Sequence, residues 1–241
     1  MADYDRQNLN ARTDSAAFID EGLRAHMLRV YNYMGIGLAI TGAVAFFFAQ
    51  WAISSADIFN LVYVSPLKWV VMLSPFAFVL ALSFGINKMS FATAQMVFWG
   101  FATVMGISLS SIFFIYTGTS IARVFFITAA MFGAMSLYGY TTKRDLTAMG
   151  SFLMMGLIGI IIAMVVNIFL QSSALEFGIS VLGVLIFVGL TAYDTQKIKE
   201  MYLELDSSEI AGKKAIMGAL TLYLDFINLF LMLLRLFGNR N

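Results

Sequence analysis

The sequence predicts an all-α membrane protein, a bundle of seven membrane-spanning helices. Of its 241 residues, 60% are hydrophobic and 12% are charged, and the mean hydropathy is +0.83. That leaves too little polar surface to cover a water-soluble globule. The apolar residues gather in seven segments, each near the ~20 residues that a helix needs to cross the hydrocarbon core. The connections between the segments are short, so we expect no separate soluble domain.

The apolar segments occupy residues 30–51, 67–86, 92–116, 120–140, 147–170, 174–196 and 214–237. We therefore divide the chain into a cytoplasmic N-terminal tail with an amphipathic lead-in at 1–29 and a seven-helix transmembrane domain at 30–238. The tail has no short apolar core with a small-residue cleavage site, so a cleavable signal peptide is not expected. In the third segment, small residues such as Gly106, Ser108 and Ser110 favour close helix packing, with a pore-lining role as the alternative.

The composition also excludes several classes of function. Cysteine is absent, so the chain has no disulfide framework and no thiolate metal or redox site. The formal net charge is +1 and the basic residues are dispersed, whereas nucleic-acid binding needs a concentrated basic face. We therefore expect the lipid bilayer as a partner, no nucleic acid and no tightly bound cofactor.

The basic residues predict the orientation, because cytoplasmic connections carry the excess of Lys and Arg. With the N-terminus inside, only Lys68 and Arg123 of the connections face outward. Eleven basic residues then lie inside: Arg6, Arg12, Arg24, Arg29, Lys88, Lys143, Arg144, Lys197, Lys199, Lys213 and Lys214. Seven full crossings place Arg235 and Arg240 outside. A last segment that enters and returns from the cytoplasmic side would satisfy the rule better, so the side of the C-terminus stays open.

Two of the 14 acidic residues, Asp194 and Asp225, lie in or near apolar segments rather than in termini and connections. A charged side chain at the centre of a spanning helix costs ~2.5–3.5 kcal/mol, so it usually faces the bundle interior, a partner or water. Asp225 comes 11 residues into the last segment, which is ~17 Å deep. Thr221 and Asn228 share its helical face, and we expect this narrow polar stripe to face inward.

Asp194 comes near the end of the sixth segment. The helical spacing of Ile198, Tyr202 and Leu205 predicts that this helix continues to about the last of them, which places Asp194 ~17 Å from its end. We therefore predict that the carboxyl groups of Asp194 and Asp225 approach within hydrogen-bonding or water-bridged distance. Such a pair cannot ionise twice cheaply in a low dielectric, and it would share a proton. Carboxylate oxygens also suit Ca²⁺, so the pair is a candidate Ca²⁺ site and pH gate.

A plainer interpretation stays open for both aspartates, which is that each caps a neighbouring helix or binds a backbone amide. An intramembrane aspartyl protease also uses two aspartates on adjacent spans, the first in a Tyr-Asp pair such as Tyr193 and Asp194. It needs Gly-x-Gly-Asp at the second, whereas Asp225 lies in Tyr-Leu-Asp-Phe. A retinal-binding protein needs a lysine deep in the last span, whereas Lys213 and Lys214 lie at its start.

Two motifs resemble the signature of the Bax inhibitor-1 (transmembrane Bax inhibitor motif) family. They are AYDTQKIK at 192–199 and LTLYLDFINLFLMLLRLFG at 220–238. TTKRDLTAMGSFL at 141–153 and GFATVMGISLSSIF at 100–113 are also similar to family segments, so the resemblance covers about residues 25–238. It implies a bundle whose last helix is wrapped by the other six, and a pH-sensitive Ca²⁺ leak channel without enzymatic activity. We expect a bacterial member in the inner membrane.

By the same resemblance, Asp194 and Asp225 match the paired aspartates that sense pH and gate the family's channel, with Ca²⁺ as the permeating ion. Some members pair the sixth-helix aspartate with an arginine near the cytoplasmic end of the second helix. This chain has FGINKMS at 84–90, so Lys88 is the candidate latch, although a lysine lacks the bidentate fork of an arginine. The alternative function is a membrane scaffold that regulates a protein partner, such as a membrane protease or a cell-death factor.

Overall fold

The computed structural model describes the backbone of residues 2–241 and the side chains of residues 21–241. Among these residues, seven helices are long and apolar enough to cross a membrane, which confirms the predicted fold class. The spans are Glu21–Ser54, Leu67–Gly85, Phe91–Ile115, Gly118–Thr141, Thr147–Leu170, Ser173–Glu200 and Ser208–Phe237. The predicted cytoplasmic side chains Arg6 and Arg12 lie outside the described side chains.

The first span belongs to a helix, α1, that runs over Ala2–Ser54 without a break. No helix boundary therefore separates the predicted lead-in from the first span, and no proline interrupts this stretch. The remaining elements are α2 (Ala56–Phe59), the π-helical turn η1 (Asn60–Val64), α3 (Leu67–Gly85), α4 (Phe91–Leu109), α5 (Ile112–Ile115), α6 (Gly118–Thr141), α7 (Thr147–Leu170), α8 (Ser173–Glu200) and α9 (Ser208–Phe237).

Side-chain caps explain where several spans begin. The hydroxyl oxygens of Ser90, Thr117, Ser172 and Ser207 each accept a hydrogen bond from the backbone N–H three residues on, at the starts of α4, α6, α8 and α9. Such N-caps satisfy donors that a helix leaves unpaired. At the end of α7, Gln171 takes a left-handed backbone conformation with φ of 48°. These signals keep the connections short, and of the consecutive spans α3 packs on α4, α7 on α8 and α8 on α9.

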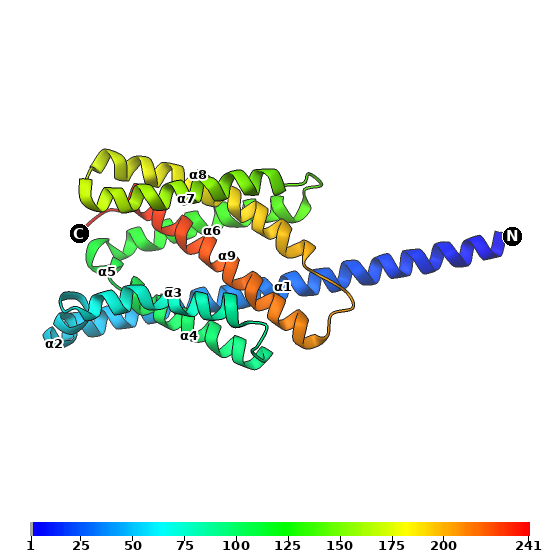
Figure 1. Cartoon of the computed structure of the whole chain (residues 1–241), viewed down its shortest axis with the longest axis horizontal. Coiled ribbons are helices and arrows are strands. Elements are labelled where there is room, and N and C mark those ends of the chain that lie inside the picture. Colours follow the sequence, from blue (N-terminus) through cyan, green and yellow to red (C-terminus); the bar gives the residue numbers. More distant parts are fainter. Residues whose placement is uncertain (1) are drawn as a thin grey trace.

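The spans alternate in direction, so the bundle has two distinct ends (Figure 1). The connections 86–90, 142–146 and 201–207 gather at the end from which the N-terminal part of α1 projects, which we call the basic end. Nine described basic residues belong to it: Arg24, Arg29, Lys88, Lys143, Arg144, Lys197, Lys199, Lys213 and Lys214. Four belong to the opposite end: Lys68, Arg123, Arg235 and Arg240.

The C-terminus lies at the opposite end (Figure 1). The last helix is continuous over Ser208–Phe237 and does not turn back. Residues after it bond to the α5–α6 connection, where the Thr117 N–H donates to the Asn239 carbonyl at 3.0 Å and the Asn241 N–H to the Ile115 carbonyl at 2.9 Å. The re-entrant alternative for the last segment was therefore wrong, because these bonds anchor the chain end across the bundle from the start of α9.

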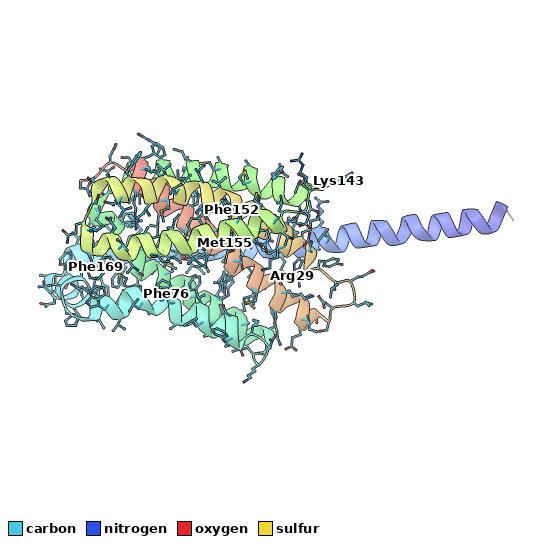
Figure 2. The ribbon with its side chains drawn as sticks, turned by 45° about the horizontal axis from the view of Figure 1, so that its top comes forward. Arg29, Phe76, Lys143, Phe152, Met155 and Phe169 are labelled. Atoms are coloured by element: carbon cyan, nitrogen blue, oxygen red, sulfur yellow. The ribbon has the colours of Figure 1, made fainter. Side chains whose placement is uncertain are left out.

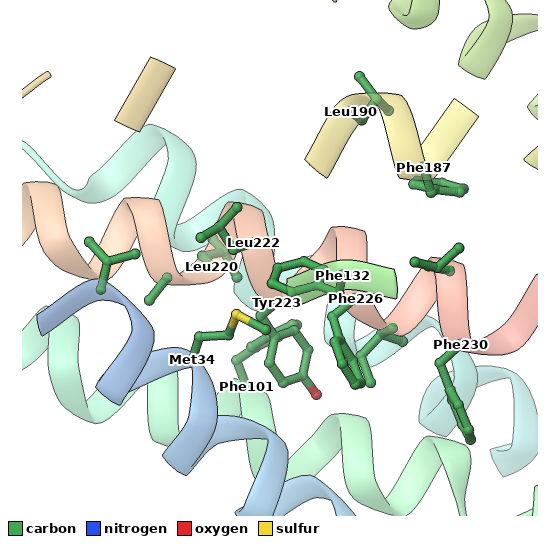
Figure 3. Close-up of a cluster of buried hydrophobic side chains, with 14 of the residues drawn as sticks. Met34, Phe101, Phe132, Phe187, Leu190, Leu220, Leu222, Tyr223, Phe226 and Phe230 are labelled. Carbon is green, nitrogen blue, oxygen red and sulfur yellow. The ribbon is translucent and has the colours of Figure 1, made fainter. Parts of the chain in front are cut away.

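Helix α9 is the centre of the bundle. In the most apolar stretch of α9, 72% of the residues are buried, whereas the corresponding share in the other spans is 6–33%. It packs against α1, α3, α4, α6 and α8, and Figure 3 shows its side chains Tyr223, Phe226 and Phe230 within the cluster of buried residues. The expectation that all six other helices wrap the last one needs a correction, because α7 packs on α8 instead.

Small residues let the helices approach closely. A Cβ at Gly106 would lie 2.8 Å from the Thr41 carbonyl oxygen of α1, and one at Gly139 would lie 2.2 Å from the Ala192 carbonyl oxygen of α8. Ser110 is buried, and its hydroxyl hydrogen-bonds to the hydroxyl of Tyr63 at 2.6 Å. Gly106 therefore serves a helix contact, as small groups do in membrane bundles, and Ser110 ties the third span to η1. A pore-lining role of the other small residues stays a prediction.

Candidate functional site

Helices α8 and α9 bring the carboxyl groups of Asp194 and Asp225 into hydrogen-bond contact. Asp225 is 5% exposed, and Asp194 is half-buried. The Oδ2 atom of Asp225 is buried, and no donor from the described residues reaches it. Two ionised carboxylates have no hydrogen to donate, so contact between them requires a proton or a cation. The predicted approach of the two groups is thus present, while their role stays a prediction.

The two aspartates meet for a reason that differs from the predicted one. Helix α8 ends at Glu200, not near Leu205, so Asp194 is ~9 Å from its end. Asp225 is ~26 Å from the start of α9. The hairpin is staggered, because the Lys214 ammonium donates to the Met201 carbonyl at 2.9 Å, which places the second turn of α9 level with the end of α8.

The loop between the two helices explains why α8 stops early. Ser207 caps α9, and Asp206 forms an ion pair with Lys214 at 2.6 Å between Oδ2 and Nζ. Both interactions need the chain to leave the helix after Met201 and run back along the first turns of α9. The apolar spacing that continues through 198–205 therefore belongs partly to a loop, since capping prevails over periodicity here.

The predicted polar stripe is assembled only in part. Thr221 and Asn228 lie on the same helix as Asp225, but both are half-buried and bond to their own helix. The Thr221 hydroxyl donates to the Met217 carbonyl at 3.1 Å, and the Asn228 side-chain amide donates to the Leu224 carbonyl at 2.8 Å. Among the described residues, neither forms a hydrogen bond to the carboxyl pair. The candidate site therefore consists of the two carboxyl groups without the rest of the predicted stripe.

Basic residues surround the pair unevenly. Lys197 is exposed one turn after Asp194 on α8 and acts on its carboxyl electrostatically. The candidate latch Lys88 is exposed in the turn after α3, and among the described side chains it forms no ion pair with Asp194. A latch through Lys88 is not formed in this conformation, and it stays a prediction.

A clamp beside the pair was not anticipated from the sequence. Gln196 is 6% exposed, its side-chain oxygen accepts from the Leu146 N–H at 2.8 Å, and its side-chain amide donates to the Arg144 carbonyl at 2.8 Å. Lys199 donates to the carbonyl of Tyr140 at 2.9 Å. The α6–α7 connection is therefore tied to the segment of α8 that carries Asp194. The available signal in the sequence was an amide side chain, Gln196, two residues after Asp194.

A chain of hydroxyl groups also leads away from the site. Thr195 follows Asp194 directly, and its hydroxyl lies 2.9 Å from that of Ser136 on α6. Ser136 in turn hydrogen-bonds to the hydroxyl of Tyr31 on α1. Sequence reasoning missed this chain, because its members come from three helices that are far apart in the sequence.

A second buried hydroxyl group lies two residues before Asp225. Tyr223 is fully buried, and its hydroxyl is 2.6 Å from that of Thr41, which donates to the Ala102 carbonyl at 2.8 Å. The rings of Phe101 and Tyr223 meet edge to face, with centroids 5.0 Å apart. These contacts lock α9 against α1 and α4, and so they hold Asp225 at one position along the bundle.

The two carboxyl groups could supply only part of the ligands of Ca²⁺, the cation predicted for this site. Ca²⁺ takes about six to eight oxygen ligands, and two carboxyl groups supply at most four. No cluster of three or more His, Cys, Asp or Glu side chains suited to a metal occurs among the described residues. A cation at the pair would therefore keep much of its water.

Comparison with known proteins places this chain among bacterial membrane proteins. The profile of a family described as "Inhibitor of apoptosis-promoting Bax1" matches residues 23–241. The chain is 50% identical over 240 residues to the uncharacterised protein RP147 of Rickettsia prowazekii, covering 100% of this chain and 99% of the relative. It is 48% identical over 232 residues to the inner membrane protein YbhL of Escherichia coli, covering 95% and 97%.

Proposed function

The chain belongs to the Bax inhibitor-1 family, and we propose that it is a pH-sensitive Ca²⁺ leak channel gated by Asp194 and Asp225. It is an integral, multi-pass membrane protein. Its E. coli relative is named an inner membrane protein, and the same location is proposed here. The excess of basic residues at the basic end supports a cytoplasmic position for that end and for the N-terminus.

One observation carries the proposal, which is the contact between two carboxyl groups in the interior of an apolar bundle. Each charge so placed costs ~2.5–3.5 kcal/mol on insertion scales. A pair that served packing alone would be replaced more cheaply by two apolar side chains. Carboxyl groups in such a place are therefore functional groups by expectation, and a proton and a cation are their natural ligands.

The gating follows from competition between these ligands. With a proton shared, the pair carries one negative charge and the two side chains hold α8 and α9 together. Loss of that proton leaves two adjacent negative charges, which repel each other and attract a divalent cation. Ca²⁺ then replaces the proton between the helices. Acid conditions favour the closed, hydrogen-bonded pair, and alkaline conditions favour Ca²⁺ entry.

The test is Ca²⁺ flux into liposomes that contain the purified protein, from about pH 5 to about pH 8. Wild type is expected to conduct more as the pH rises. Asp194→Asn and Asp225→Asn are expected to conduct at a rate that no longer depends on pH, because neither variant keeps the two carboxyl groups that share a proton. Asp57→Asn, in the exposed helix α2, is the matched control and keeps the wild-type profile.

A second candidate is a scaffold that regulates a protein partner, such as a membrane protease or a cell-death factor. The family is described as an inhibitor of a protein that promotes apoptosis, which favours this function. The same liposomes separate the two functions. If neither wild type nor any variant moves Ca²⁺ at any pH, the channel function is excluded. The scaffold function is then the remaining candidate.

A further inference from the structure

A lateral groove separates α1 from α6 on the face of the bundle that meets the bilayer. The two helices do not pack closely against each other, and a cavity of about 600 Å³ lies between them. Met34 of α1, Phe132 of α6 and Phe226 of α9 are among its lining residues. The Phe132 and Phe226 rings are 5.5 Å apart between centroids (Figure 3). The floor of the groove is thus the central helix itself.

The dimensions of the groove match one leaflet. On α1 its lining extends from Arg24 to Gly35, and on α6 from Ala129 to Tyr140. Each stretch covers 11 residue steps, which is ~17 Å along a helix. Half of the ~30 Å hydrocarbon core is ~15 Å. An occupant that reaches from the membrane surface to the midplane would therefore fill the groove.

The polarity of the groove changes along its length. Arg24 is exposed at the basic end, where the polar headgroups of a leaflet would lie. Beyond Tyr31 and Ser136, whose hydroxyls bond to each other, the lining residues are apolar toward the midplane. An anionic group beside Arg24 with a hydrocarbon chain below it complements both parts.

Two glycines keep the groove open. Gly35 and Gly133 face each other's helices along the lining, and a Cβ added at either would meet no atom within 4 Å. At other glycines of the bundle, such as Gly139, a neighbouring helix occupies the space beside the Cα atom instead. The space at Gly35 and Gly133 is therefore not used for packing within the described chain.

We propose that this groove binds one acyl chain of an anionic phospholipid, with the lipid phosphate at Arg24. The bilayer supplies the ligand at the open side of the groove. The lining includes Phe226, one residue after Asp225, so a bound lipid lies beside the helix that carries the carboxyl pair. The lipid site does not depend on ion conduction, and its test measures binding alone.

The experiment is native mass spectrometry of the purified full chain with phosphatidylglycerol or phosphatidylcholine added. Gly35→Leu and Gly133→Leu add side chains to the groove at positions where a Cβ meets no protein atom within 4 Å. Displacing a few methylenes of a bound chain is enough for a loss of about tenfold in lipid affinity. Gly42→Leu is the matched control on α1, because its Cβ position is equally open and outside the groove lining. It is expected to bind lipid as wild type does.

Arg24→Gln tests the headgroup. Wild type is expected to retain phosphatidylglycerol in preference to phosphatidylcholine, and this variant is expected to retain the two equally. Thermal unfolding of each variant checks that it is folded. Equal lipid binding by Gly35→Leu, Gly133→Leu and Gly42→Leu overturns the proposal, as does equal retention of both lipids by wild type. A lipid-free dimer that the groove-filling variants abolish identifies a second copy as the occupant instead.

Discussion

Helices α7 and α9 are both apolar spans of the same bundle, but they have opposite environments. Helix α7 has no charged residue and is the more apolar of the two, yet only 6% of its apolar window is buried. Helix α9 contains Asp225 and is 72% buried. Phe152, Met155 and Phe169 of α7 lie on the outside of the bundle (Figure 2), and they are 65–82% exposed.

The difference shows that apolar side chains favour the interior of a protein much less in lipid than in water. Lipid tails are as apolar as leucine, so an apolar helix gains little by moving from lipid to the interior. A polar side chain gains a partner there. The helix with polar groups therefore becomes the centre, and the most apolar helix becomes the periphery.

The largest expected effect compares one phenylalanine from each helix. Phe226 is 2% exposed and meets the Phe125 and Phe132 rings edge to face, whereas Phe169 is 82% exposed. Phe226→Ala should lower the free energy of unfolding by about 2–4 kcal/mol, because it opens a cavity in the core. Phe169→Ala should leave it nearly unchanged. Denaturant unfolding in micelles measures both, and similar losses would contradict the central position of α9.

The next effect compares two glycines. Gly139→Ala pushes a methyl group against the Ala192 carbonyl and should cost about 1–3 kcal/mol. Gly159→Ala, in α7, meets no atom within 4 Å, and it should leave stability unchanged or slightly higher. Thermal unfolding of the two variants gives the comparison. A stable Gly139→Ala protein would show that α6 and α8 can separate without cost.

Gln196 ties the connection before α7 to α8, in addition to the packing between these two helices. Removing its two hydrogen bonds with Gln196→Ala should cost about 1–2 kcal/mol and leave the Leu146 N–H without its partner. Hydrogen exchange of residues 142–147 should then speed up, while exchange in α9 stays slow. Gln95→Ala, at a half-buried position of α4, is the control. Unchanged exchange at Leu146 would mean that the clamp does not hold α7.

The smallest effect concerns the start of α7. The Thr147 N–H donates to Asp145 Oδ1 at 2.8 Å, and hydrogen bonds from Thr147 lower the pKa of Asp145. Because the pKa of Asp145 is lower in the folded protein than in the unfolded chain, its ionised form stabilises the start of α7 above about pH 4. This stabilisation is lost as the pH falls through the pKa of the folded protein. Exchange of the Thr147 amide should therefore accelerate in acid relative to its intrinsic rate. Asp145→Asn should abolish this dependence, and its persistence there would assign it to another group.

Much of the fold could be predicted from the sequence because its determinants are local. All seven spans were predicted, since each depends on a run of apolar residues in one stretch of chain. The boundaries were less accurate at 197–213, where the caps at Ser207 and the ion pair of Lys214 decide the helix ends. The contact of Asp194 with Asp225 was predicted, but the prediction assumed equal distances from the two helix ends. These distances differ, because α8 ends at Glu200 and α9 begins at Ser208.

The neighbours of the candidate site could not be predicted in the same way. Gln196 finds its partners 50 and 52 residues away, and the hydroxyls of Thr195 and Ser136 are separated by 59 residues. Thr195 and Gln196 are consecutive on α8, yet their partners lie on different segments. The partner of each depends on which helix faces become neighbours, and no pattern within one helix contains that information.

By itself, the sequence determined that this chain is a seven-span membrane protein with two carboxyl groups in its last two spans. These properties follow from the free energy of transfer of each segment into lipid, which depends on that segment alone. Only the tertiary structure decided which helices contact α9, which bonds hold the C-terminus at the opposite end, and that α1 and α6 leave a groove between them. These depend on contacts between helices, where shape at positions such as Gly139 and Gly35 selects which faces meet and which stay apart.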